Sequence, residues 1–178
     1  MHVLFLILTS ILLAAPELAI YKNDNYRFEV QFPQQHQEEI KVMEQKFATI
    51  EFLVLSGQEV IQEGELKVNV SYKVIASHYQ PNEKFKQNGV KFQDLVYDYA
   101  KQSNKESFLI NKLIILSEKY SKDAFIFIVA DEAMKSVTHR KIFIRNGMTY
   151  SLSIVAPSGF LTREQVQNYF NSLKIKGK

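Results

Sequence analysis

Cysteine is absent from the 178-residue chain, and glycine and proline are scarce, with 6 and 4 residues. Without cysteine the protein has no disulfide framework, no thiolate nucleophile and no thiolate metal site. The low glycine and proline content, together with 46% hydrophobic and 23% charged residues, excludes a disordered, collagen-like or low-complexity chain. A chain of this length fits one globular domain whose core needs no cross-links.

The net charge is also small, because 22 Lys and Arg residues stand against 19 Asp and Glu residues, a formal +3. Nucleic-acid-binding domains usually carry a basic stripe and a pI above about 9, so nucleic acid is not an expected partner. The 4 His residues are scattered without metal-ligand spacing, and the sequence holds no phosphate-binding loop, nucleophile elbow or zinc-protease motif. We therefore expect no metal, no cofactor and no enzymatic activity.

The N-terminus carries one strongly apolar run, Val3–Leu13 (VLFLILTSILL), which contains no charge. This run is too short for a membrane-spanning helix, which needs about 20 residues, and it has the length of the apolar part of a secretory signal peptide. We predict a signal peptide over residues 1–19, and leave open cleavage after Ala14 or Ala15 and an uncleaved N-terminal anchor. Export predicts a secreted or periplasmic location, and a secreted chain without cysteine is typical of bacteria.

Residues 20–178 contain no linker and no internal repeat, so we expect a single domain. Tyr26–Phe32 alternates apolar and polar residues, which predicts a strand with one buried face, ended by Pro33. The polar stretch Gln34–Glu39 (QQHQEE) is expected to be an exposed loop. This part of the domain therefore begins with a half-buried strand.

Two further strands are predicted next. Phe47–Leu55 is apolar on both sides, and Leu66–Ile75 alternates again. The glycines of Ser56–Glu65 predict a long hairpin connection between these strands.

A change to helical spacing follows. Apolar residues recur from Phe92 to Ala100 at intervals of three and four, which predicts an amphipathic helix from near Gly89 to near Ser103-Asn104. Leu113–Leu116 and Ala124–Ala130 are apolar on both faces, which favours central strands covered on two sides.

A hairpin and a helix are expected to complete the domain. Val137–Arg145 and Met148–Ala156 flank Asn146-Gly147, a pair typical of a two-residue type I′ turn. This turn sets Phe143 opposite Tyr150, Lys141 opposite Leu152, and His139 opposite Ile154. Thr162 and Gln165 then form the pattern of a capping box at the start of a C-terminal helix. The order of elements predicts an α+β fold, with an antiparallel sheet of about six to seven strands and helices on both faces, a three-layer α/β/α sandwich.

A family resemblance rests on several of these segments. The chain has a strand ending in Phe-Pro (Tyr26–Pro33), a helix after its early strands, the hairpin strand Tyr150–Pro157 (YSLSIVAP), and a closing helix running into Tyr169–Ile175 (YFNSLKI). In these features it resembles the PsbP/Mog-like fold group over Tyr21–Ile175. The resemblance implies a non-enzymatic binding or accessory module, and it brings no common catalytic residues.

The clearest candidate binding surface lies on the first strand of the hairpin. His139, Lys141 and Arg145 share one parity, with Phe143 between them and Tyr150 opposite, whereas Arg140 lies on the other face. Such a basic strip with aromatic residues suits an anionic partner, either a protein carboxylate or an anionic envelope component such as a phospholipid headgroup. In the alternative interpretation, the Lys and Arg stems cover apolar surface of the hairpin.

Two functions remain open on the sequence. The first is a secreted or periplasmic binding or accessory module, expected to be a monomer, with a possible role in peripheral membrane contact. The second is a small ligand-binding or hydrolase-like protein with an apolar pocket. The pair Asp131-Glu132 offers carboxylates for acid–base chemistry, but adjacent strand residues point to opposite faces, which favours a solvated turn.

Overall fold

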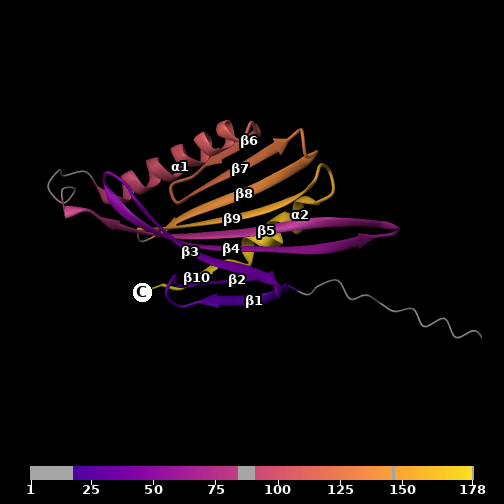
Figure 1. Cartoon of the computed structure of the whole chain (residues 1–178), viewed down its shortest axis with the longest axis horizontal. Coiled ribbons are helices and arrows are strands. Elements are labelled where there is room, and N and C mark those ends of the chain that lie inside the picture. The colour runs from indigo at the N-terminus through magenta and orange to yellow at the C-terminus, as the bar shows by residue number, and fades with distance from the viewer. Residues whose placement is uncertain (1–17, 84–90, 146, 178) are drawn as a thin grey trace, which may run out of the picture.

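The computed structural model describes residues 18–83, 91–145 and 147–177 of the chain (Figure 1). Among these residues it contains the following strands and helices: β1 (Leu18–Asn23), β2 (Phe28–Pro33), β3 (His36–Glu44), β4 (Ala48–Glu63), β5 (Leu66–Pro81), α1 (Phe92–Ile110), β6 (Ile114–Tyr120), β7 (Ala124–Asp131), β8 (Ser136–Arg145), β9 (Met148–Pro157), α2 (Arg163–Asn171) and β10 (Lys174–Ile175). The part of the chain that the structure describes is therefore mainly β.

The strands form two antiparallel sheets. Seven strands make the large sheet in the order β3-β4-β5-β9-β8-β7-β6, and β1, β2 and β10 make a small sheet with β2 in the centre. The prediction of an antiparallel sheet with helices is confirmed at this level. In the large sheet, β3 and β6 are the two edge strands.

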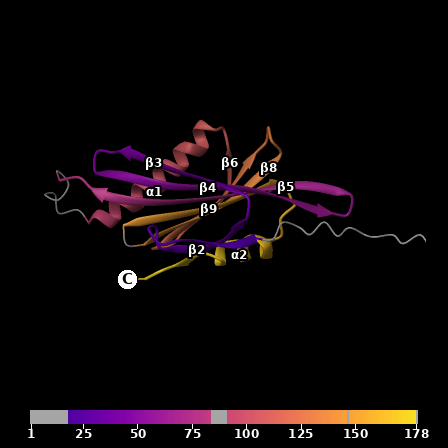
Figure 2. The same cartoon turned by 60° about the horizontal axis from the view of Figure 1, so that its bottom comes forward.

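The two helices pack against different cores. Helix α1 inserts Val96, Ala100 and Phe108 into a cluster on one face of the large sheet, together with residues of β4, β7 and β8. The opposite face packs against α2 and the small sheet, which supply Tyr169 and Phe28 among others. Figure 2 shows the small sheet and α2 below the large sheet.

The predicted three-layer sandwich with helices on both faces is thus only partly met. The layer opposite α1 consists largely of the small sheet, and α2 contributes only nine residues to it. We call the two sides of the large sheet the α1 face and the α2 face.

The hairpin register predicted from Asn146-Gly147 is confirmed. Phe143 lies opposite Tyr150, Lys141 opposite Leu152, and His139 opposite Ile154. Gly147 has a φ of +71°, the left-handed value that this turn requires; Asn146, and with it the turn type, lies outside the described residues.

Two further predictions are also confirmed. Tyr26, Phe28, Val30 and Phe32 are all buried, as their alternation indicates. The capping box of α2 is formed, because the Thr162 hydroxyl accepts from the Gln165 N–H at 3.2 Å and the Gln165 carboxamide accepts from the Thr162 N–H at 2.8 Å.

Two loops predicted in the first half of the domain are wrong. Gln34–Glu39 is exposed as predicted, but only Gln34 and Gln35 lie outside a strand. His36–Glu44 is the edge strand β3, paired along its whole length with β4. Ser56–Glu65 is not a long connection either. Strand β4 continues to Glu63 and turns at Gly64, whose φ is +61°. Pairing with a neighbour satisfies the backbone of these polar segments without any need for apolar side chains.

The helix and the strand that follows it also differ from the prediction. Helix α1 continues past Ser103-Asn104 to Ile110, because Phe108 packs against Phe127 with ring centres 5.2 Å apart; the expected start near Gly89 lies outside the described residues. The run Leu113–Leu116 is not central. It belongs to the edge strand β6, where Leu116 is 57% exposed.

Strand β7, which was also predicted to be covered on both faces, is covered fully on only one. Phe125, Phe127 and Val129 are buried under α1, whereas Ile126 and Ile128 are only half-buried on the α2 face. Local composition could not reveal that the small sheet and α2 stop short of this end of the large sheet.

The predicted signal peptide falls mainly on residues 1–17, outside the described part of the chain. Within the proposed boundary, Leu18 and Ala19 belong to β1, where they pair with Pro33 and Phe32.

Candidate functional site

The candidate site is a row of side chains across the α1 face of the large sheet. Lys73 on β5 lies directly opposite Ser153 on β9, and Ser153 lies directly opposite Arg140 on β8. On the other side, Ser56 on β4 pairs with Lys73, and Gln37 on β3 pairs with Ser56. Directly opposite residues in antiparallel strands lie about 4.5–5.5 Å apart and share a face, so the row runs unbroken from the β3 edge to α1. We call Lys73, Ser153 and Arg140 the cationic row.

Arg140 is held at one end of this row by neutral groups. Its Nε donates to the Ser153 hydroxyl at 2.9 Å, and its Nη1 donates to the side-chain Oδ1 of Asn104 at 2.7 Å. The guanidinium carbon lies 5.0 Å from the centre of the Phe108 ring. Burial lowers the pKa of Arg140. A guanidinium remains charged in proteins nonetheless, so Arg140 keeps a cation on the α1 face, beside α1.

No carboxylate neutralises this charge within the described residues. The ion pairs found there are Lys22–Glu29, Lys41–Glu39, Lys105–Glu118 and Lys176–Asp24, and none includes Arg140 or Lys73. The described hydrogen bonds of Arg140 use Nε and Nη1, which leaves Nη2 without a partner among the described residues.

Lys73 adds a second positive charge to the row. Desolvation lowers the pKa of its ammonium, and repulsion from Arg140 and then from Lys41 lowers it further, against a smaller opposing effect of Glu39. Lys73 is exposed to solvent. The field at this position is therefore positive.

A groove of about 590 Å³ extends from Lys73 toward the β3 edge, and neither Ser153 nor Arg140 lines it. Seven side chains on the α1 face line it: Gln35, Gln37, Ser56, Gln58, Ser71, Lys73 and Val155. Its walls thus offer carboxamides and hydroxyls, which both donate and accept hydrogen bonds, with Lys73 as the charged group. Such a lining can bind an anionic group together with neighbouring amides. Within the described residues, no cluster of three or more His, Asp or Glu side chains is arranged to hold a metal ion.

The basic strip predicted from the sequence lies on the opposite side of the sheet, the α2 face. His139, Lys141 and Phe143 are half-buried there, and Arg145 is exposed at the end of β8. The Lys141 ammonium lies 4.6 Å from the centre of the Phe143 ring. The strip residues are therefore brought to one face, with the Lys141 stem lying along apolar surface.

Two residues of that strip, Tyr150 and His139, do not contribute positive charge to the surface. Tyr150 is buried in the core, where its hydroxyl donates to the Tyr26 carbonyl oxygen at 3.0 Å. His139 borders a small hollow with Leu161 and Pro157, and burial lowers its pKa, which favours the neutral ring at neutral pH. The charge of the strip at neutral pH therefore comes from Lys141 and Arg145.

The chain turns at Asp131-Glu132, as predicted. Asp131 ends β7, and its carboxylate accepts from the backbone N–H of Met134 at 3.0 Å.

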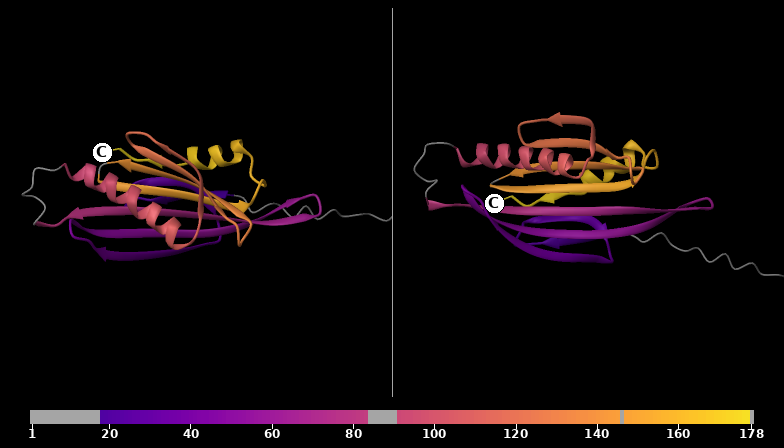
Figure 3. Two further views of the ribbon diagram at one scale, coloured as in Figure 1. Left: turned by 90° about the horizontal axis from the view of Figure 1, so that it is seen from above. Right: turned by 45° about the horizontal axis from the view of Figure 1, so that its top comes forward.

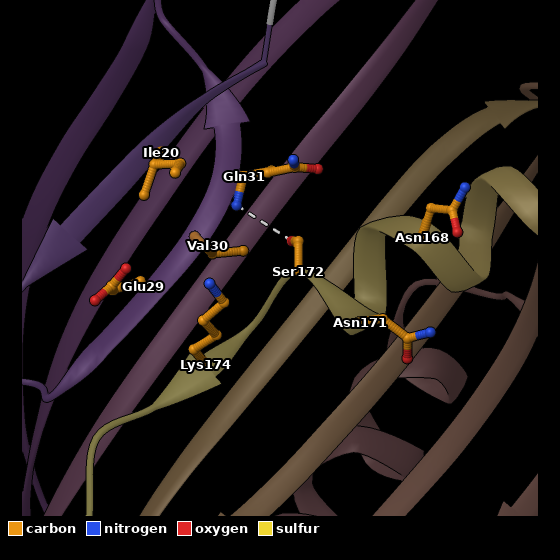
Figure 4. Close-up of a pocket in the computed structure, with 8 residues that line it drawn as sticks. All are labelled: Ile20, Glu29, Val30, Gln31, Asn168, Asn171, Ser172 and Lys174. Carbon is orange, nitrogen blue, oxygen red and sulfur yellow. Dashed lines mark hydrogen bonds between the residues drawn. The ribbon is translucent and has the colours of Figure 1, made fainter.

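A second hollow, of about 220 Å³, lies beside the end of α2 (Figure 4). Its Ser172 hydroxyl accepts from the Gln31 N–H at 3.2 Å and donates to the Tyr169 carbonyl oxygen at 2.7 Å. This hydroxyl therefore closes the small sheet onto α2, and it has no proton left to offer a ligand.

The cationic row was not predicted from the sequence. The only sign of it in the sequence was that Arg140 lies on the face of its strand opposite the basic strip. The row became visible only when β5 was found beside β9, because strand order across the sheet is not encoded locally.

Comparison of the chain with protein-family models, with curated proteins and with solved structures gives no match. None of the helices within the described residues is long and apolar enough to cross a membrane. The functional conclusion therefore rests on the geometry of the site.

Proposed function

We propose that the protein is a non-enzymatic binding module that takes an acidic segment of a partner protein in the groove on its α1 face. The observation that carries the proposal is the cationic row, in which Lys73 and Arg140 flank Ser153 and neither forms an ion pair with a carboxylate of the described residues. We further propose a secreted or periplasmic location, on the basis of Val3–Leu13. The proposed fold assignment is the PsbP/Mog-like group, supported by helices that pack on opposite faces of the sheet.

The electrostatics favour an anion over a neutral ligand. Desolvation is the main cause that lowers the pKa of Lys73, and repulsion from Arg140 adds to it. A carboxylate placed between them relieves this repulsion and gains charge-assisted hydrogen bonds, which are about twice as strong as neutral ones. In the free protein, Lys73 and Arg140 therefore carry positive charge that an anionic ligand can neutralise.

The neutral part of the groove favours a polypeptide as the carrier of that anion. An extended peptide presents alternating N–H and C=O groups, and the carboxamides of Gln35, Gln37 and Gln58 can satisfy both kinds. Arg140 is half-buried beside α1 and does not line the groove, so a flat anionic bilayer would meet Lys73 but not Arg140. An acidic protein segment therefore fits the site better than a membrane surface.

The hydrolase-like alternative needs a hydroxyl beside a base. The groove contains Ser56 and Ser71, and its lining includes one histidine, His36. This ring is turned to the α2 face, where it packs edge-on against Tyr21 and Phe32, and its Nδ1 is within 3.0 Å of the Pro33 carbonyl oxygen. The arrangement favours binding over hydrolysis.

Titration of the ¹⁵N-labelled protein with a hexaglutamate peptide tests the proposal. We expect the amide signals of β4, β5 and β9 around Ser56, Lys73 and Ser153 to shift, and those of β1 and β2 to remain in place. Titrations with inorganic phosphate and with vesicles of anionic phospholipid provide the comparison. A peptide that shifts no signals, or that shifts only those of Lys141 and Arg145, overturns the proposal, as does a stronger response to vesicles than to peptide.

A further inference from the structure

The two edge strands of the large sheet differ in how well they are protected from pairing with another chain. At β6 the register with β7 shifts between Ile115 and Ser117, and α1 lies along the strand, with the Lys101 ammonium 4.3 Å from the centre of the Tyr120 ring. A register shift and a covering helix are both devices that keep an edge strand from pairing with another chain. The β6 edge is therefore protected.

The β3 edge has neither device. All nine residues of His36–Glu44 are exposed, and their register with β4 contains no shift and no proline. Seen from above, β3 forms one rim of the large sheet (Figure 3), and α1 meets it at one end, where the Tyr99 hydroxyl lies 3.8 Å from the Met43 sulfur. Its exposed side chains include Ile40 and Val42, at 59% and 63%. A long, regular and partly apolar edge of this kind is a template for another strand.

We infer that β3 pairs antiparallel with β3 of a second copy, around a two-fold axis through Ile40, so that the two large sheets become one continuous sheet. The axis stands normal to the sheet, which keeps both α1 helices on one face. This inference does not use the cationic row, although the groove of the proposed function reaches β3 at Gln37.

The order of charges along β3 selects this pairing. With Ile40 opposite Ile40 of the second copy, Glu39 lies opposite Lys41 of the second copy, and Lys41 lies opposite its Glu39. Within one chain these two side chains already form an ion pair at 2.9 Å, so pairing assembles four alternating charges on the α1 face. On the α2 face, His36 meets Glu44 of the second copy at each end.

Neighbouring registers are less favourable. A two-fold axis at Lys41 sets Lys41 against itself and Glu38 against Glu44 of the second copy. An axis at Glu39 sets two glutamates against each other. Like charges directly opposite one another destabilise a strand pair. An axis at Val42 places Lys41 opposite Met43 and so loses the four-charge arrangement.

Charge reversal with rescue tests the inference by sedimentation equilibrium. We expect the full protein to form a dimer whose association weakens in Lys41→Glu, because four glutamates then face one another. The double variant Glu39→Lys, Lys41→Glu restores opposite charges and should regain at least most of the wild-type association. These side chains are exposed, so the thermal midpoints of the folded variants serve as the control. A wild type that is monomeric at all concentrations, or a Lys41→Glu variant that associates as tightly as wild type, overturns the inference.

Cross-linking tests the register separately, since the chain has no native cysteine. Directly opposite residues fall within the Cα separation that a disulfide needs, about 4.4–6.8 Å. With an added mild oxidant, Ile40→Cys should form a covalent dimer in high yield. Val42→Cys is the matched control and should not, because its counterpart lies four residues along the paired strand. A higher yield for Val42→Cys contradicts the Ile40 register.

Discussion

Arg140 donates to Ser153 from a position under α1, while Lys73 lies opposite the same serine on the next strand, so one hydroxyl separates two unneutralised cations. This arrangement carries a cost in the free protein. Desolvating a cation without a carboxylate partner is unfavourable, and apolar replacements at such positions are often neutral or stabilising. An unneutralised pair of this kind is what a site that accepts an anion requires.

Arg140→Met should separate binding from stability. The methionine keeps much of the stem over Phe108 and removes the charge. We expect affinity for hexaglutamate to fall by roughly ten-fold or more, the equivalent of losing a charge-assisted hydrogen bond. The free energy of unfolding, measured with urea, should change by less than about 1 kcal/mol or should increase. A loss of about 3–5 kcal/mol with unchanged affinity would mean that Arg140 serves the fold alone.

Glu59 gives a prediction about pH. The carboxyl is buried and accepts from the Tyr72 hydroxyl at 2.5 Å, and burial raises its pKa above the ordinary 4.5. The fold therefore favours the protonated form. The stability that this group contributes is complete below the unfolded pKa and is lost as pH rises through the raised folded pKa.

Glu59→Gln removes that titration and keeps an acceptor for Tyr72. At about pH 7 the variant should melt a few degrees above wild type, and the difference should shrink toward about pH 4. Exposed Glu65 near the hairpin tip offers the matched control, Glu65→Gln. A variant that melts below wild type at neutral pH, with no pH-dependent difference, contradicts the assignment.

Gly147→Val tests the hairpin. The glycine has a φ of +71°, and a Cβ placed there would lie 4.0 Å from the Phe92 ring, an ordinary contact. The cost should therefore come from the backbone, about 1–3 kcal/mol by urea unfolding. Gly147→Asn is the control, since asparagine tolerates positive φ, and it should lose much less. Equal losses for the two variants would exclude the backbone explanation.

Export can be tested in cells. Replacing Leu6 and Leu8 by Arg interrupts the apolar run Val3–Leu13, and the protein should then accumulate in the cytoplasm. Replacing the same residues by Ile keeps the run apolar and should preserve export. Envelope localisation of the Arg variant in fractionated cells would rule out the signal.

The sequence was most informative where the physical signal is local. The Asn-Gly pair determines the register of β8 with β9, and the pattern at Thr162 and Gln165 marks the start of α2, because each depends on the neighbouring backbone. Strand β3 could not be recognised from its composition, since a polar segment becomes a strand only when β4 supplies its hydrogen-bond partners.

The same limit explains the candidate site. The sequence predicted that Arg140 lies on the face away from the strip. It could not predict that Lys73 shares this face, because 66 residues separate the two in the chain and strand β9 lies between their strands in the sheet. Their convergence depends on β5 lying beside β9. Strand β6 is the opposite case. Its apolar residues predicted a central strand, but the strand lies exposed at the edge of the sheet.

The most direct measurement compares Lys73→Gln with Lys141→Gln, which remove the same charge from opposite faces of one sheet. Binding of a fluorescent hexaglutamate peptide is followed by anisotropy at increasing NaCl, with Lys67→Gln as a control at the far end of β5. Weakened binding and a flatter salt dependence in Lys73→Gln alone would support the cationic row as the binding site. Weakened binding in Lys141→Gln, with Lys73→Gln unchanged, would contradict it and move the site to the α2 face.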